Sequence, residues 1–95
     1  MEIEVQEFYP LKEGKEQKNG KIGTLHVYLP SLDLDIRGIA VFKKKRHYFI
    51  QPPSYYGPDK VRYPAVSFVN LETQVDFIKS LVRAGSKFMK GWKPE

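Results

Sequence analysis

The densest chemical signal in this chain is an unbroken run of four cations at residues 43–46, followed directly by the ring-bearing residues 47–49. Residues 37–95 hold twelve of the 16 lysines and arginines and four of the 11 acids, a formal charge of +8, whereas residues 1–36 carry −3. Clustered cations neutralise phosphates, and neighbouring rings can stack on bases. The run therefore favours a polyanion such as nucleic acid as partner. In the simpler alternative, the lysines are solvated at a hairpin tip and protect the sheet from edge-to-edge aggregation.

A second group of aromatic and basic residues follows within residues 52–63. Tyr55 and Tyr56 stand between prolines, where regular burial is difficult, and Lys60 and Arg62 come shortly after them. Aromatic rings beside cations make this segment a candidate surface for stacking and phosphate contacts. Packing within strands and turns is the alternative interpretation of the tyrosines.

Further cations recur at helical spacing towards the C-terminal end. Lys79, Arg83 and Lys87 fall on one outward face of a predicted helix, where they can contact phosphates and can also complement the negative end of the helix dipole. The predicted nucleic-acid-binding residues are Lys43, Lys44, Lys45, Arg46, Tyr55, Tyr56, Lys60, Arg62, Lys79 and Arg83.

Catalytic and metal-binding chemistry has weaker support. The chain has no cysteine, and neither His26 nor His47 has a partner at metal-ligand spacing. Asp33 and Asp35 project from one face of a predicted strand, and paired carboxylates can hold a divalent cation or transfer protons. Alternatively, Asp33 ends a turn, and Asp35 pairs with Arg37 or with a lysine of a neighbouring strand. We expect no enzyme activity, no catalytic or metal site, no cofactor and no small-molecule substrate.

The elements that position these residues follow from hydrophobic periodicity. Alternation of apolar and polar residues predicts strands, and a stripe at helical spacing predicts one helix with Asn70 as its N-cap and Gly85 as its stop. The predicted strands are residues 2–9, 22–29, 32–42, 47–51 and 63–69, and the predicted helix is 71–84. We therefore predict an α+β fold in which an antiparallel meander of about five strands is covered on one face by a C-terminal amphipathic helix.

The third predicted strand has an unusual pattern. Gly38, near its middle, indicates a bulge or a close backbone approach. Strict alternation predicts that apolar residues occupy both faces, with Leu34, Ile36, Ala40 and Phe42 on one face and Ile39 and Val41 on the other. We therefore expect this strand to become buried on both sides towards its end.

Besides the turn-rich excursion that follows residue 51, two segments lie outside the predicted secondary structure. Residues 12–21 have no apolar side chain and contain the turn signal Asn-Gly at 19–20, so we predict a mobile loop there. Residues 86–95 form a basic aromatic tail. This tail either grips nucleic acid without a fixed structure or folds back so that Phe88 and Trp92 complete the core.

Length and composition limit the organisation of the chain. Its 95 residues, 41% of them hydrophobic, fit a single domain (1–95) with a folded core at residues 2–84. No apolar run approaches the roughly 20 residues of a membrane span, and the lack of cysteine fits a reducing compartment. We therefore expect a cytoplasmic protein without membrane contact. The uncovered sheet face and free sheet edges favour a homodimer.

Several of these segments, in this order, resemble the stage V sporulation protein G (SpoVG) family. The similarity covers roughly residues 25–84 and rests on Asp35-Ile36-Arg37, the apolar strand 49–51 with the following Pro52-Pro53-Ser54, the segment 62–70 and the amphipathic helix. The resemblance implies a bacterial, dimeric protein that binds nucleic acid with a site preference and regulates gene expression. By position, it associates Arg62, Lys79 and Arg83 with binding.

A second, weaker resemblance is to single-stranded-DNA-binding transcriptional coactivators, which also end a curved antiparallel sheet with one helix. Together, the residues and the resemblances predict a SpoVG-like, DNA-binding or RNA-binding regulator of transcription. We expect weak sequence selectivity, because phosphate contacts carry little sequence information. Both single and double strands are compatible with this chemistry. The competing hypothesis is a small protein-interaction module that uses a free sheet edge or the excursion around Tyr55 and Tyr56.

Overall fold

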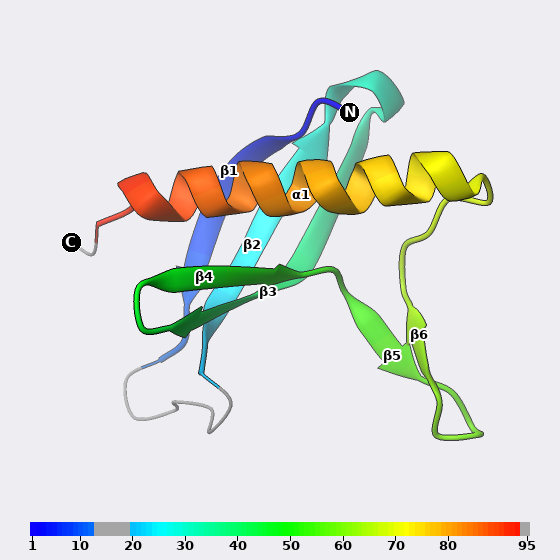
Figure 1. Ribbon diagram of the computed structural model, residues 1–95, viewed down its shortest axis with the longest axis horizontal. Coiled ribbons are helices and arrows are strands. Elements are labelled where there is room, and N and C mark those ends of the chain that lie inside the picture. Colours follow the sequence, from blue (N-terminus) through cyan, green and yellow to red (C-terminus); the bar gives the residue numbers. More distant parts are fainter. Residues whose placement is uncertain (13–19, 94–95) are drawn as a thin grey trace.

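The computed structural model describes residues 1–12 and 20–93, which form an α+β fold (Figure 1). Within these residues, four antiparallel strands form one sheet in the order β1-β2-β3-β4, and a long helix crosses one of its faces. Two further short strands form a separate hairpin. The elements are β1 (Glu4–Pro10), β2 (Lys21–Leu29), the 3-10 turn η1 (Pro30–Leu32), β3 (Leu34–Lys44), β4 (His47–Gln51), β5 (Ser54–Tyr56), β6 (Arg62–Pro64) and α1 (Leu71–Gly91).

The core lies between α1 and the sheet face that it covers. In β2, Leu25, Val27 and Leu29 alternate with half-buried residues and are fully buried, as a strand with one covered face requires. Phe77 and Leu81 project from α1 at helical spacing and are also fully buried. Burial of side chains of this size contributes about 1.5–3 kcal/mol each, so this layer is a main source of hydrophobic stabilisation.

The helix begins where the sequence predicts but continues past its predicted stop. The side chain of Asn70 caps it by accepting a hydrogen bond from the amide of Thr73 at 3.0 Å. Gly85 lies inside the helix, and a Cβ placed on it would come within 3.1 Å of side-chain atoms of Ile50 and Leu25. The predicted stop at Gly85 is wrong, because this glycine allows the helix to approach the sheet closely and does not end it.

Most of the predicted tail is a continuation of α1. Met89 is 1% exposed, and the ring of Trp92 lies edge-on against Phe8 with the ring centroids 4.8 Å apart. The half-buried Phe88 also packs against the core. Of the two alternatives for this segment, folding back onto the core is therefore the one observed. Residues 94–95 lie outside the described residues.

Of the two alternatives predicted for Gly38, the structure shows the bulge, which divides β3. Three steps along β3, from Ile36 to Ile39, match two steps along β2, from Val27 back to Leu25. Gly38 has a φ of +76°, a conformation that glycine adopts without strain. The extra residue shifts the alternation of every side chain that follows it.

The predicted faces of β3 are wrong because the alternation restarts after this bulge. Ile36, Ile39 and Val41 are all buried against α1. Ala40 and Phe42 project from the opposite face, which no other layer of the described chain covers. The ring of Phe42, which alternation predicts on the same face as Ile36, therefore lies on the open side of the sheet.

A separate two-stranded hairpin replaces the fifth predicted strand. β6 spans three residues rather than 63–69, and it pairs with β5, which lies in the segment predicted to be irregular. Pro52 and Pro53 separate β4 from β5, since neither proline can donate a backbone hydrogen bond to the main sheet. The meander therefore has four strands, and the predicted α+β class is confirmed.

The predicted mobile loop at 12–21, with its turn signal at 19–20, depends on residues 13–19, which lie outside the described residues. Beside that segment, the amide of Lys43 donates a hydrogen bond to the carbonyl of Gly20 at 3.0 Å, which joins the start of β2 to the end of β3. Among the described residues, no helix combines the length and the apolar character that a membrane span requires.

Candidate nucleic-acid interface

The sheet face opposite α1 is open, and one end of it adjoins the β5–β6 hairpin, which stands apart from the helix in Figure 1. A hollow of about 370 Å³ lies between the sheet and this hairpin, and we call it the hairpin hollow. Its lining includes Lys21, Phe42 and Gln51 from the sheet and Tyr56 and Arg62 from the hairpin. The volume falls within the range of ligand-binding pockets, roughly 300–1,000 Å³.

The strand pairing of the hairpin places Tyr56 and Arg62 on the same face. They are direct cross-strand partners, whereas the neighbouring rung joins Tyr55 to Tyr63 on the opposite face. The Nε of Arg62 donates a hydrogen bond to the Oγ of Ser54 at 2.6 Å, which orients the guanidinium group. Among the described residues, no carboxylate pairs with Arg62, so its charge is available to an anionic ligand.

Tyr55 belongs to the internal structure of the hairpin. Its ring stacks on that of Tyr63, with the centroids 5.8 Å apart. The hydroxyl of Tyr63 donates to Oδ2 of Asp59 at 2.5 Å, and the amide of Val61 donates to Oδ1 at 3.1 Å. These hydrogen bonds lower the pKa of Asp59, and the bond from Tyr63 raises the pKa of that phenol, because it favours the ionised carboxylate and the neutral hydroxyl. Tyr55 and Tyr56, predicted as one surface, therefore face opposite ways.

The four-cation run forms the tip of the β3–β4 hairpin, as predicted. Lys44 belongs to the last paired rung, which leaves Lys45 and Arg46 as a two-residue loop. Lys43 lies on the α1 side, with its Nζ 5.3 Å from the ring centroid of Tyr48. Because alternate strand residues face opposite ways, Lys44 lies on the open side. The run is thus divided between the two faces of the sheet.

Both hairpin loops contain a lysine in a strained backbone position. Lys45 has a φ of +57° and Lys60 a φ of +62°. This left-handed region costs a residue with a Cβ roughly 1–2 kcal/mol, whereas glycine occupies it freely. Tight hairpin loops often require a residue with positive φ, so the turn geometry accounts for both positions.

Phe42 and Phe49 add an aromatic surface that the sequence analysis missed. They are cross-strand partners on the open face, and Phe49 is 53% exposed. A second hollow, of about 440 Å³, is lined by both rings and by Lys44. It shares Phe42 and Gln51 with the hairpin hollow, so the two hollows adjoin. The available signal was the period-2 pattern of β4: because Ile50 is buried, Phe49 must face outward.

The two hollows form a continuous surface that we call the open-face strip. Its residues are Lys44, Phe49, Phe42, Gln51, Lys21, Tyr56 and Arg62. Three predicted site residues meet here although they are distant in sequence, namely Lys44, Tyr56 and Arg62. Cations beside exposed rings are the combination that contacts both the phosphates and the bases of a nucleic acid.

Other predicted site residues lie away from this strip. Lys79 and Arg83 project, exposed, from α1, which covers the opposite face of the sheet. Lys60 lies in the loop between β5 and β6, and it lines neither hollow of the strip. The ten predicted residues therefore do not form one surface.

The other end of the open face is acidic, and its acids have partners. The hydroxyl of Tyr28 donates to Asp33 at 2.8 Å, which raises the pKa of Tyr28. The Nε2 of His26 lies 3.2 Å from Oδ1 of Asp35, close enough for an ion pair but without the geometry of a hydrogen bond. Asp33 ends the η1 turn, as in the simpler alternative, but Asp35 pairs with His26 and not with an arginine or lysine. Within residues 1–12 and 20–93, no three potential ligands gather to hold a metal ion.

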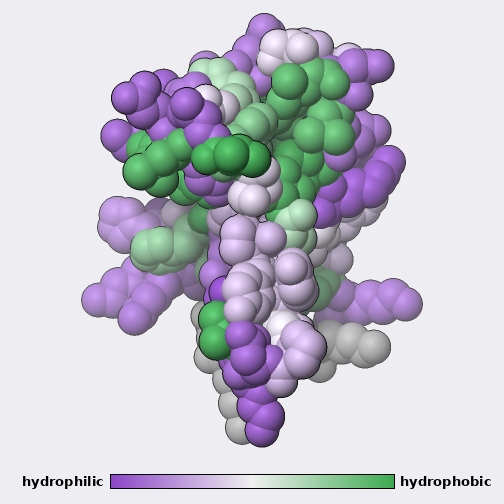
Figure 2. Space-filling model, turned by 90° about the vertical axis from the view of Figure 1, so that its right-hand side faces the viewer, coloured by the Kyte–Doolittle hydropathy of each residue, from purple (hydrophilic) through white to green (hydrophobic). Residues whose placement is uncertain are grey.

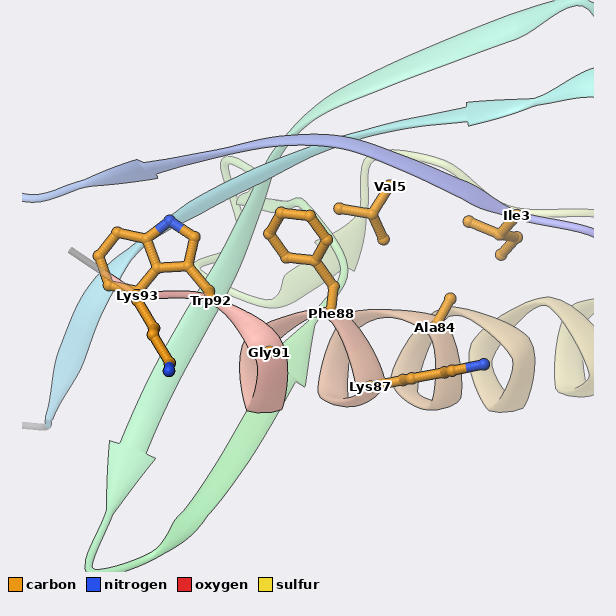
Figure 3. A pocket seen from close by; sticks show the side chains of 8 residues that line it. All are labelled: Ile3, Val5, Ala84, Lys87, Phe88, Gly91, Trp92 and Lys93. Atoms are coloured by element: carbon orange, nitrogen blue, oxygen red, sulfur yellow. The ribbon is translucent and has the colours of Figure 1, made fainter. Parts of the chain in front are cut away.

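A third hollow, of about 620 Å³, lies between β1 and the C-terminal half of α1 (Figure 3), and we call it the β1–α1 groove. Its apolar wall is formed by Ile3, Val5, Ala84, Phe88 and Trp92. Val5 and Phe88 point toward one another across it, and Lys87 and Lys93 also line it. Because β1 is an edge strand of the described sheet, its outer backbone groups can pair with a further strand.

Exposed apolar side chains gather at the start of α1. Val69 is fully exposed, and Leu71 and Val75 are 76% and 44% exposed. In Figure 2, a strongly hydrophobic patch, bordered by hydrophilic atoms, lies in the upper part of this side of the molecule, above the paler β5–β6 hairpin with its hydrophilic tip. Such a surface favours contact with a protein over contact with nucleic acid.

Compared with known proteins, the chain matches no family model, no curated protein and no solved structure. The arrangement of its own residues therefore has to indicate the function.

Proposed function

We propose that the protein binds nucleic acid on the open-face strip and acts as a SpoVG-like regulator of gene expression. The observation that carries this proposal is the meeting of Lys44, Tyr56 and Arg62 with the exposed ring of Phe49 and the half-buried ring of Phe42 on one side of the sheet. No described carboxylate pairs with Lys44 or Arg62, so both charges can neutralise phosphates. A bacterial cytoplasm is the setting that we propose, without catalysis or a cofactor.

Charge on the open face would guide a bound strand. Phosphates are attracted to the strip and repelled by Asp33 and Asp35 at the other end of the face. The loop cations Lys45 and Arg46 extend the positive surface beyond the last rung of the β3–β4 hairpin. Because most of these contacts go to the backbone, we propose weak sequence selectivity.

A binding assay with two matched double variants tests this proposal. Lys44→Ala with Arg62→Ala removes two charges from the strip, and each lost phosphate contact should reduce the log–log salt slope by about 0.7–0.9. Lys79→Ala with Arg83→Ala removes the same charge from α1 and should bind as the wild type does. Equal losses in both variants would indicate general attraction without a site. No binding by the wild type at low salt would exclude the function.

We also propose that the protein is a homodimer in which a second copy covers the β1–α1 groove. Ile3 and Val5 of β1 line the groove together with residues of α1, and strand alternation directs Glu2 and Glu4 to the open side of the sheet. Antiparallel pairing of two β1 edges about a twofold axis would continue the sheet from one copy to the next, place both α1 helices on the same face and cover the apolar wall of each groove.

Light scattering after size-exclusion chromatography tests the dimer. Ala84→Glu should convert dimers to monomers without loss of helix content, because it introduces a charge into the covered apolar wall and glutamate is a good helix former. Lys79→Glu, on the exposed outer face of α1, is the control and should remain dimeric. A monomeric wild type would exclude the dimer and favour the alternative function, in which the β1 edge or the surface around Tyr55 binds a different protein.

A further inference from the structure

We infer that the open-face strip takes single-stranded nucleic acid, with an unpaired base stacked on Phe49. This inference rests on the proposed function and adds the class of nucleic acid to it. It gives roles to Phe49 and Gln51, which the charge pattern of the sequence does not single out.

Phe49 is exposed in a position where the fold gives it no internal role. It is 53% exposed, whereas Phe77 on the covered side is fully buried. Its neighbours Tyr48 and Ile50 pack toward the core, so the period-2 geometry of β4 directs the ring of Phe49 to the open side. Among the described residues, this ring stacks on no other aromatic side chain. A face of the ring therefore remains for a ligand.

Polar groups stand on both sides of this ring. On the open face of β3, Lys44, Phe42 and Ala40 follow one another at intervals of about 7 Å. Phe49 pairs with the middle residue of the three, and Gln51 pairs with Ala40. A phosphate can therefore contact Lys44 while the next base stacks on Phe49, and the amide of Gln51 can both donate and accept hydrogen bonds at a base edge.

The β5–β6 hairpin continues this series of contacts. Arg62 and Tyr56 share the hairpin hollow with Phe42 and Gln51. A strand that leaves Phe49 toward the hairpin meets a guanidinium group and then a tyrosine that is 72% exposed. An extended single strand can make all of these contacts, since its phosphates and its base faces are separately accessible.

A double helix cannot make the central contact. Each base of a duplex is covered on both faces by its neighbours, so Phe49 has no base to stack on unless a nucleotide leaves the stack. Proteins that read duplex DNA usually insert a helix or a β-ribbon into the major groove, whereas these rings lie on the face of a sheet. Phe49 therefore contributes to the binding of single strands, whereas the affinity for a duplex held through its phosphates does not depend on this ring.

Fluorescence anisotropy with the full chain tests the inference. The probes are labelled oligothymidine, labelled oligouridine and a mixed-sequence DNA duplex. Phe49→Leu removes the ring but keeps a large apolar side chain, and it should weaken binding of both single strands about 5- to 150-fold, the loss expected for one stacked base. Duplex binding should not change. Tyr9→Leu is the matched control and should bind as the wild type does. Tyr9 is 44% exposed, and its neighbour Phe8 is buried, so the ring of Tyr9 lies on the open side of the opposite edge strand, β1.

A second variant and melting curves separate the loss of stacking from the loss of folding. Phe49→Tyr retains a ring and should bind single strands as the wild type does, and melting curves show whether each variant is folded. Equal single-strand affinity of folded Phe49→Leu and wild type would overturn the inference, as would a wild type that prefers the duplex. A wild type that binds none of the three probes at low salt would instead reject the proposed function itself.

Discussion

The two ends of the open sheet face belong to the same strands but differ in how their charges are partnered. At the acidic end, Asp33 accepts a hydrogen bond from Tyr28, and Asp35 pairs with His26. In the open-face strip, no described carboxylate neutralises Lys44 or Arg62. Asp33 and Asp35 repel phosphates, whereas the unneutralised cations beside exposed rings remain available to a phosphate-bearing ligand. This difference locates the proposed interface at one end of the face.

Charge reversal at Arg62 should reduce the affinity for nucleic acid more than any other single change at the two ends of the face. Arg62→Glu places a carboxylate in the hairpin hollow and replaces attraction to phosphate with repulsion, so we expect the affinity for a labelled oligonucleotide to fall about 100-fold at low salt. Lys60→Glu makes the same change in the hairpin loop, outside the strip, and should cost less. Equal losses in an anisotropy titration would mean that the hollow has no special role.

Relief of backbone strain at Lys45 should raise the stability of the protein while changing its nucleic-acid affinity little. Lys45→Gly removes the cost of a left-handed residue, about 1 kcal/mol, and should raise the melting temperature by about 4–8 °C. Binding should fall only slightly, since Lys44 and Arg46 remain. Lys44→Gly, at a regular strand position, should lower the melting temperature instead. Thermal unfolding followed by circular dichroism measures both changes, and a destabilised Lys45→Gly would contradict the strained loop.

Neutralisation of the acids at the acidic end of the open face should allow nucleic acid to bind more tightly. Asp33→Asn with Asp35→Asn removes the charges that repel phosphates, and we expect the affinity to rise by about two- to fivefold at low salt. The gain should shrink as salt is added, because the acids and the strip are separated by much of the sheet. A loss of affinity in a folded double variant would place nucleic acid at the acidic end.

The β5–β6 hairpin should show the smallest effect, in its pH dependence. The lowered pKa of Asp59 stabilises the hairpin above the carboxyl's ordinary pKa of 3.8, and this contribution is lost as the pH falls through the folded-state value below it. The raised pKa of Tyr63 stabilises the hairpin below 10.0, and this contribution is lost as the pH rises through the higher folded-state value. Tyrosine signals in NMR spectra should report both transitions, and Asp59→Asn should abolish the acid one.

Periodicity was sufficient to predict the architecture but not its local exceptions. Alternation in β2 and the helical stripe of α1 correctly predicted an antiparallel sheet covered by one C-terminal helix. Gly85 was interpreted as a stop because a sequence does not show which neighbour a glycine must approach; the side chains of Ile50 and Leu25 supply that reason. Strict alternation predicts the wrong faces for β3 beyond Gly38, because the extra residue of the bulge reverses which side chains face α1.

The residues of the candidate site that are charged, or that stand beside charged residues in the sequence, could be predicted from the sequence. Lys44, Tyr56 and Arg62 were all predicted from cations and rings in the sequence, and the structure brings them to one strip. Phe42 and Phe49 carry no charge, and their exposure depends on strand register, so they were missed. Sequence spacing alone also does not show that α1, with its basic residues, lies on the other side of the sheet.

Chemical-shift mapping of backbone amides during titration with a single-stranded oligonucleotide locates the binding surface residue by residue. We expect the largest changes at Lys44, Phe49, Gln51 and Arg62, and no change at the amides of Asp33 and Lys79. Changes concentrated on the outer face of α1, with the strip unaffected, would contradict the proposed interface.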